Sequence, residues 1–178
     1  MIATSFGSIR PWRLEDAEAL AAYANNLKIW RQMRDSFPHP FTLERARAFI
    51  DASRKPSSSL FLALASPHEA IGGIGITRGD DIHHRSAELG YWLAEPFWGR
   101  GYMRAAIVAL TSYLFAQTDL LRIYAEPFAS NLASIRALER AGYICEGRLR
   151  CSVVKEGQVL DQLLFAAVRT VFFTPEAR

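Results

Sequence analysis

The sequence predicts a mixed α/β domain of the α+β class, built on a mostly antiparallel central sheet. The chain has 178 residues, a length that suits one domain spanning residues 1–178. Hydrophobic residues make up 50% and aromatic residues 12%, which is enough for a sizeable core and too much for intrinsic disorder. The spacing of apolar residues changes along the chain from helical to strand-like and back, so helices and strands are both expected.

The N-terminal part is predicted to hold one strand followed by two helices. Alanines and leucines recur at helical spacing over residues 14–27, which predicts the first helix. The second is predicted over residues 42–53, with Thr42 as its N-cap. Residues 37–41 carry two prolines and are expected to be irregular, and residues 55–59 are expected to form a loop.

The middle of the chain is predicted to form three strands. Short apolar runs at residues 60–65 and 70–77 flank a turn at residues 66–69, which indicates a hairpin. Residues 86–93 are the third strand of this stretch.

The last part predicts a single parallel crossover followed by a hairpin. A strongly amphipathic helix is expected over residues 101–117, a strand over 121–126 and a second helix over 130–141. Residues 143–150 and 159–168 then form a closing antiparallel pair. The crossover between the strands on either side of the first helix is expected to be parallel and right-handed.

Charge and cysteine usage exclude several functional classes. The net charge of +3 comes from scattered arginines, whereas a nucleic-acid-binding module gathers its positive charge on one face or arm. No apolar run approaches the roughly 18 residues of a membrane span. Cys145 and Cys151 do not form a CxxC pair, so we expect reduced thiols in a cytoplasmic protein that binds neither nucleic acid nor membranes.

No metal site is predicted. The four histidines lie in turn-like segments and show neither H-x3-H nor HExxH spacing. The two cysteines are badly spaced for zinc.

The segment from Pro96 to Arg104 is the first candidate for chemistry. Its two glycines allow a sharp turn and close backbone approach to a ligand. The following helix begins with N–H groups that have no partner within the helix, and these favour an anion; Arg100 and Arg104 add positive charge. The alternative is a plain strand-to-helix turn that happens to use glycine.

The second candidate segment begins at Glu126, a carboxylate at the end of an apolar strand. Pro127 cannot donate a ladder hydrogen bond, so two parallel neighbours are expected to splay apart here. Asn131 and Ser134 share one helical stripe just beyond, although both residue types also serve as ordinary helix caps. Glu88, on the strand 86–93, is either a second carboxylate of the site or a member of a structural ion pair.

Taken together, these segments resemble the GNAT acetyltransferase superfamily, and more narrowly its Rim-type (RimJ/RimL-like) enzymes, which acetylate the N-termini of ribosomal proteins. The resemblance covers about residues 9–168. It rests on the order and spacing of these segments: Arg10–Asp16, Ile71–Gly75, Ala87–Leu93, Pro96–Gly101, Asn131–Ser134 and Glu139–Tyr143. It implies a GNAT-like domain with a splayed pair of strands and helices on both faces.

The resemblance also implies a site for acetyl-CoA as co-substrate. The backbone of Tyr91, Trp92 and Leu93 would pair with the pantetheine arm, and Asn131 would hold it. The pyrophosphate would lie in the loop formed by Trp98, Gly99, Arg100, Gly101, Tyr102, Met103 and Arg104.

The catalytic roles that the resemblance implies are less uniform within the family. Glu126 matches a general base of one Rim branch, and Glu88 is the alternative base. Ser134 lies where relatives place a hydroxyl near the departing sulfur. The tyrosine that serves many members as general acid is replaced here by Leu138, which leaves Ser134 as its substitute.

Three functions are compatible with the sequence. The favoured one is an N-acetyltransferase whose acceptor is a protein or peptide N-terminal α-amine. The others are an acetyltransferase of a small-molecule amine and a catalytically silent acyl-CoA-binding or sensor domain. Residues 30–41 and 155–158 are expected to wall the acceptor side, and a homodimer is the expected assembly by analogy with relatives.

Overall fold

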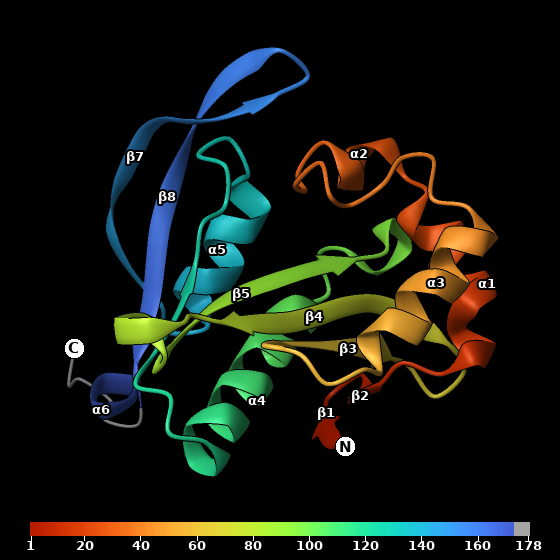
Figure 1. Ribbon diagram of the computed structural model, residues 1–178, viewed down its shortest axis with the longest axis horizontal. Helices are drawn as coiled ribbons and strands as arrows, with labels where there is room; N and C mark the ends of the chain where they lie inside the picture. Colours follow the sequence, from red (N-terminus) through yellow and green to blue (C-terminus); the bar gives the residue numbers. More distant parts are fainter. Residues whose placement is uncertain (173–178) are drawn as a thin grey trace.

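The computed structural model describes residues 1–172, which form an eight-stranded mixed sheet in the order β1-β2-β3-β4-β5-β6-β8-β7 (Figure 1). The strands are β1 (Ile2–Thr4), β2 (Gly7–Pro11), β3 (Ser59–Ala65), β4 (Ala70–Arg78), β5 (Ser86–Leu93), β6 (Arg122–Ala125), β7 (Ile144–Lys155) and β8 (Gln158–Val168). Every neighbouring pair is antiparallel except β5 and β6, which are parallel. The predicted fold class is therefore confirmed.

Helices cover both faces of the sheet. They are α1 (Ala17–Ala24), α2 (Leu27–Trp30), α3 (Leu43–Ser53), α4 (Tyr102–Gln117), α5 (Leu132–Arg140) and α6 (Arg169–Phe172). Single 3-10 turns occur at η1 (Leu14–Asp16), η2 (Asp81–His83) and η3 (Glu95–Phe97). Within residues 1–172, no helix combines the length and the apolar character that crossing a bilayer requires.

The alternation of side chains along the strands separates two hydrophobic cores. Leu62 and Leu64 of β3 belong to the larger core, which contains the buried faces of α4 and α5. Ala63, between them, points the other way and belongs to the core formed with α1 and α3. A strand that is buried on both faces explains why β3 and β4 are nearly continuous apolar runs in the sequence.

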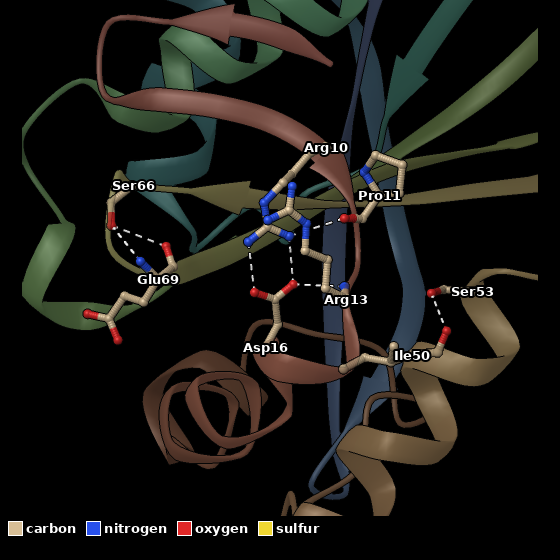
Figure 2. A network of polar contacts seen from close by, with 8 residues as sticks. All are labelled: Arg10, Pro11, Arg13, Asp16, Ile50, Ser53, Ser66 and Glu69. Carbon is tan, nitrogen blue, oxygen red and sulfur yellow. Dashed lines mark hydrogen bonds and ion pairs between the residues drawn. The ribbon is translucent and has the colours of Figure 1, made fainter.

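A buried ion pair fixes the chain between β2 and α1 (Figure 2). The Arg10 guanidinium donates to both carboxylate oxygens of Asp16, at 2.7 and 2.8 Å, and the backbone N–H of Arg13 donates to the same carboxylate at 2.9 Å. Both side chains are 10% exposed or less. Burial alone would raise the pKa of Asp16, but these hydrogen bonds and the neighbouring positive charges hold that pKa below its ordinary value.

The N-terminal elements differ from the prediction in two places. The single expected strand is a hairpin, β1–β2. The helix predicted over residues 14–27 divides into η1, α1 and α2, because two asparagines after α1 bond to other backbone groups. Asn25 accepts a hydrogen bond from the N–H of Phe41, and Asn26 accepts one from the N–H of Lys28.

The C-terminal strands are longer than expected. The strand predicted to end at Arg150 continues to Lys155, and β8 begins at Gln158. The register shifts twice along this pair, and Cys151 adopts a left-handed φ of 51° at the second irregularity. Its N–H donates to Asp161 across the pair, so a side chain replaces the regular ladder there.

Candidate active site

The two parallel strands diverge halfway along the sheet. They pair only over Ser86–Glu88 and Arg122–Tyr124. Beyond this point β5 continues for five residues, whereas the chain after β6 stays with β8: the Pro127 carbonyl accepts from the N–H of Leu163. The expected splayed pair of strands is thus present, with a slot between β5 and the segment after β6.

A cavity of about 1100 Å³ occupies this slot. It is lined by nearly all of the residues that the sequence singled out: Glu88, Tyr91, Trp92, Leu93, Trp98, Gly99, Gly101, Tyr102, Met103, Arg104, Glu126, Asn131 and Ser134. Of the predicted residues, Arg100 lies outside the lining, and its guanidinium stands 5.7 Å from the centre of the Phe97 ring.

The loop before α4 has the backbone of a ligand-binding turn. Gly99 and Gly101 have φ angles of 75° and 77°, which glycine adopts without strain. A Cβ atom at either position would meet no protein atom within 4 Å, so the space beside this backbone is open. Gly101 is the N-cap of α4, whose first N–H groups have no partner within the helix. The loop therefore offers backbone donors and partial positive charge to an anion.

Two arginines of α5, Arg136 and Arg140, also line the cavity, although they were not predicted from the sequence. They are spaced i, i+4 and so share one helix face, a signal that was available in the sequence. The side chain of Arg104 donates to the carbonyl of Arg140 at 2.9 Å and so joins α4 to the end of α5. The end of the cavity near the glycine loop is consequently basic.

The first turn of α5 carries a hydrogen-bonded hydroxyl pair. Asn131 is the N-cap and accepts from the N–H of Ser134 at 3.1 Å, as an ordinary cap residue does. The Ser134 hydroxyl lies 2.6 Å from the phenol oxygen of Tyr91, which reaches it from β5. Burial raises the pKa of Tyr91 well above its ordinary value, and the bond to Ser134 opposes this only in part. Leu138 is fully buried in the core.

Two carboxylates lie at the opposite end of the cavity from the glycine loop. Burial raises the pKa of Glu126, the negative charge of Glu88 raises it further, and Arg34 partly opposes the shift. Glu88 forms an ion pair with Arg34. From the sequence, Glu88 is either a carboxylate of the site or a member of a structural ion pair, and in the structure it is both. Arg34 was not predicted, because its partner lies 54 residues away in sequence.

The segment that contains α2 lines the cavity beside these carboxylates, from Lys28 to Ser36. The turn between β7 and β8 holds it in place. Lys155 is only 4% exposed in its side chain, pairs with Asp35 at 2.7 Å and lies 3.6 Å from the centre of the Trp30 ring. A cation that is desolvated against an indole ring and paired with a carboxylate makes a firm contact between these two elements.

Within residues 1–172, no group of three or more His, Cys, Asp or Glu side chains is arranged to hold a metal ion. That the chain works without a metal stays a prediction.

Comparison with known proteins identifies the family of the chain. The model of the acetyltransferase (GNAT) domain family matches residues 8–144. An uncharacterized N-acetyltransferase, p20, from Bacillus licheniformis is 30% identical over 91% of this chain and 92% of its own length. The [ribosomal protein uS5]-alanine N-acetyltransferase of Escherichia coli (strain K12) is 30% identical over 92% of this chain and 84% of its own.

A solved structure agrees with these sequence relatives. RimJ of Mycobacterium smegmatis, in complex with a CoA disulfide, superimposes with a TM-score of 0.82 at 24% identity, covering 97% of this chain and 88% of that one. At this level of identity the likeness shows the shared fold. The family match and the two sequence relatives show that the chain belongs to the GNAT family and is an N-acetyltransferase, a member of the acyltransferases.

Proposed function

We propose that this acetyl-CoA-dependent N-acetyltransferase acetylates the α-amine at the N-terminus of a protein or peptide, by direct attack of the amine on the thioester. The observation that carries the proposal is a single cavity with a basic loop of glycines at one end and two carboxylates at the other. One end suits the phosphates of the donor, and the other suits an amine that must lose a proton.

The donor end is assigned by the backbone rather than by side chains. The unfilled space beside Gly99 and Gly101 fits the pyrophosphate, and Arg104, Arg136 and Arg140 supply positive charge around it. The part of β5 that has lost its parallel neighbour includes residues 91–93 and offers the pantetheine arm an edge with no adjacent strand. At the end of this edge the Leu93 carbonyl accepts a hydrogen bond from the Trp98 indole N–H at 2.7 Å. A slot that contacts the donor along its length holds the thioester in one place, which is the main requirement of a direct transfer.

Glu126 is the proposed general base. Its raised pKa keeps a carboxylate basic enough to accept a proton from an ammonium group, and Glu88 is the alternative base. Two protons leave the nitrogen in the reaction: one is released by way of the base, and the thiolate of CoA gains one as the C–S bond breaks. Asn131 and Ser134 line the same cavity, and in this proposal the reacting atoms meet beside them.

The acceptor class follows from the cost of making the amine neutral. At pH 7 deprotonation costs about 1 kcal/mol for an α-amine and about 4.6 kcal/mol for a lysine side chain. Leu138 stands where a tyrosine acid would be, and within residues 1–172 the half-buried carboxylate of Glu126 forms no ion pair. With such modest means of proton transfer, the less basic amine is the better substrate. The name of the E. coli relative, an N-acetyltransferase of an alanine in ribosomal protein uS5, agrees with this choice.

A competition between two amines tests the acceptor. A peptide with a free N-terminus and an internal lysine is incubated with acetyl-CoA, and the modified position is mapped by mass spectrometry. We expect acetylation of the α-amine to be faster than that of the lysine. The same peptide with a blocked N-terminus is the control and is expected to react slowly. Predominant lysine acetylation, or activity on small non-peptide amines alone, would contradict the proposed acceptor.

A further inference from the structure

The hydroxyl pair of Tyr91 and Ser134 spans the slot at a point where the proposed reaction needs a donor. The two oxygens are 2.6 Å apart, and both side chains line the cavity. Tyr91 belongs to β5 and Ser134 to α5, so the bond joins the two walls that diverge around the slot.

The direction of this hydrogen bond follows from the acidity of the two hydroxyl groups. Among the residues that the structure describes, Ser134 is the partner of the Tyr91 phenol. A phenol is a much stronger acid than an aliphatic alcohol, so the Tyr91 O–H is the better donor and the serine oxygen the better acceptor. If Tyr91 donates, the single hydrogen of Ser134 is free to point into the cavity. This arrangement is therefore the favoured one.

The pair also lies at the right depth in the slot. Along β5, Tyr91 is three residues from Glu88 at the acceptor end and two from Leu93 at the loop end, about 10 and 7 Å. A thioester held between the glycine loop and the carboxylates has its reacting atoms within this interval.

We propose that Tyr91 is a positioning residue, which donates a hydrogen bond to Ser134 and thereby aims the serine hydroxyl at the departing sulfur of CoA. The proposal rests on the donor placement given above. Ser134 then donates a hydrogen bond to the thiolate that forms as the C–S bond breaks and the C–N bond closes. Tyr91 acts through Ser134 and does not touch the donor's reacting atoms.

Tyr91 holds its own proton throughout. Burial raises the pKa of its phenol far above that of a free thiol, so transfer of that proton towards sulfur would leave a buried phenolate. The proton that finally neutralises the thiolate therefore comes from the amine by way of the base or from solvent. Because Tyr91 keeps its proton, it differs from a tyrosine that acts as general acid. The position of such a tyrosine is occupied here by Leu138, which is buried.

The chain offers a matched control in a second tyrosine pair. The phenol of Tyr143 lies 2.8 Å from the hydroxyl of Thr111, both side chains are buried, and burial raises the pKa of this phenol as well. Neither residue lines the cavity. Tyr91→Phe and Tyr143→Phe remove the same hydroxyl and the same kind of bond, so they separate an effect on catalysis from an effect on packing.

Steady-state rates of CoA release are measured for Tyr91→Phe, Ser134→Ala, their double variant and Tyr143→Phe, with any amine that the parent enzyme uses. We expect Tyr91→Phe to lower kcat by about three- to tenfold without raising KM for acetyl-CoA. Ser134→Ala is expected to lower kcat by at least about tenfold. Adding Tyr91→Phe to Ser134→Ala should change nothing more, and Tyr143→Phe should keep the parent kcat.

A binding measurement gives a second readout that does not depend on turnover. CoA and desulfo-CoA, which lacks the sulfur, are compared at pH 9, where part of the thiol is ionised. The parent is expected to prefer CoA, Tyr91→Phe and Ser134→Ala to reduce that preference about three- to tenfold, and Tyr143→Phe to retain it.

Three outcomes would overturn the inference. Tyr91→Phe could leave both kcat and the preference for CoA over desulfo-CoA unchanged, or Tyr143→Phe could lose as much of kcat as Tyr91→Phe does. The third is that Tyr91→Phe lowers kcat by the same factor in the Ser134→Ala background as in the parent. A parent enzyme that releases CoA from acetyl-CoA with no amine, or that binds no CoA, would instead contradict the proposed function.

Discussion

Arg10 and Asp16 place two opposite charges in the interior beneath the first helix. Among the described residues 1–172, each forms its hydrogen bonds with the other and with nearby backbone. Removing one partner leaves an uncompensated buried charge, so we expect Asp16→Asn to lower the free energy of unfolding by about 3–5 kcal/mol. Because the pKa of Asp16 is lowered on folding, its contribution is present at neutral pH and disappears as pH falls below about 4.

Denaturant unfolding at a series of pH values measures both effects. Glu15→Gln is the control, since Glu15 is the exposed neighbour of Asp16. The parent and Asp16→Asn should converge in stability at low pH. An equal loss in both variants, or a difference that does not shrink in acid, would contradict the role of the ion pair.

Glu126 makes a second prediction at the residue scale, this one on catalysis. We expect Glu126→Gln to keep its affinity for CoA and to lower kcat by roughly 10²–10⁴-fold, the usual contribution of a general base. The defect should shrink as pH rises, because the amine then loses its proton unaided. The pKa of Glu126 is raised in the folded state, so its negative charge lowers the stability of the fold at neutral pH. The glutamine variant should therefore be no less stable than the parent at pH 7.

Glu88→Gln is the matched comparison for this prediction, because Glu88 lines the same cavity from β5 and carries an ion pair with Arg34. If Glu126→Gln turns over normally and Glu88→Gln does not, the base is on the other strand.

Residues that act through local pattern were predictable, and residues that act through distant contacts were not. Asn131 and Ser134 follow a strand and begin a helix, so a few neighbouring residues in the sequence are enough to predict where they lie. Arg34 meets Glu88 across 54 residues, and Lys155 meets Asp35 across 120. No periodicity or turn signal links such pairs, because only the assembled sheet brings them together.

At the scale of elements, the turn before α4 depends on backbone conformation more than on side-chain identity. We expect Gly101→Val to abolish CoA binding, because a branched side chain would fill the open space beside the loop and resist a φ of 77°. Binding is measured by calorimetry on the folded variant.

The turn between β7 and β8 supplies a control for backbone strain. Gly157 has a φ of 76°, and a Cβ there would also meet no atom within 4 Å, yet it does not line the cavity. Backbone strain should lower the free energy of unfolding by about 1–3 kcal/mol in Gly157→Val, as in Gly101→Val. Gly157→Val should nevertheless bind CoA like the parent. If Gly101→Val binds CoA as tightly as Gly157→Val does, the phosphates lie elsewhere.

Helix and strand boundaries were harder to predict than their order. The periodicity of residues 14–27 is helical throughout, but Asn25 and Asn26 use their side chains to bond other backbone groups and so divide the helix. The first strand of the closing pair, β7, extends beyond its predicted end because it accommodates two irregularities and still pairs with β8. At Asn25 and along β7 the outcome was decided by hydrogen bonds to residues outside the local pattern, whereas the bond between Asn26 and Lys28 is local.

The whole molecule consists of two parts of one sheet that meet over a short parallel contact. Strands β1–β5 form one part and β6, β8 and β7 the other, and β5 and β6 share only three register pairs (Figure 1). The order of elements predicted this topology, since a single helix between two strands requires a parallel crossover. The size of the opening was not predictable, because it depends on how firmly the segment after β6 stays attached to β8.

A ligand that fills the slot contacts both parts of the sheet at once, so its binding should stabilise the whole fold rather than one loop. CoA at about 100 times its Kd is expected to add about 2.7 kcal/mol, because it binds the folded chain and not the unfolded one. For a chain of this length that corresponds to a rise in Tm of roughly 5–10 °C, which a thermal-shift titration measures. Gly101→Val should show no such rise, whereas Gly157→Val should show the full one from its own lower starting Tm. No rise in the parent at millimolar CoA would contradict the placement of the donor in the slot, and a rise of equal size in Gly101→Val would show that CoA binds this fold without using the glycine loop.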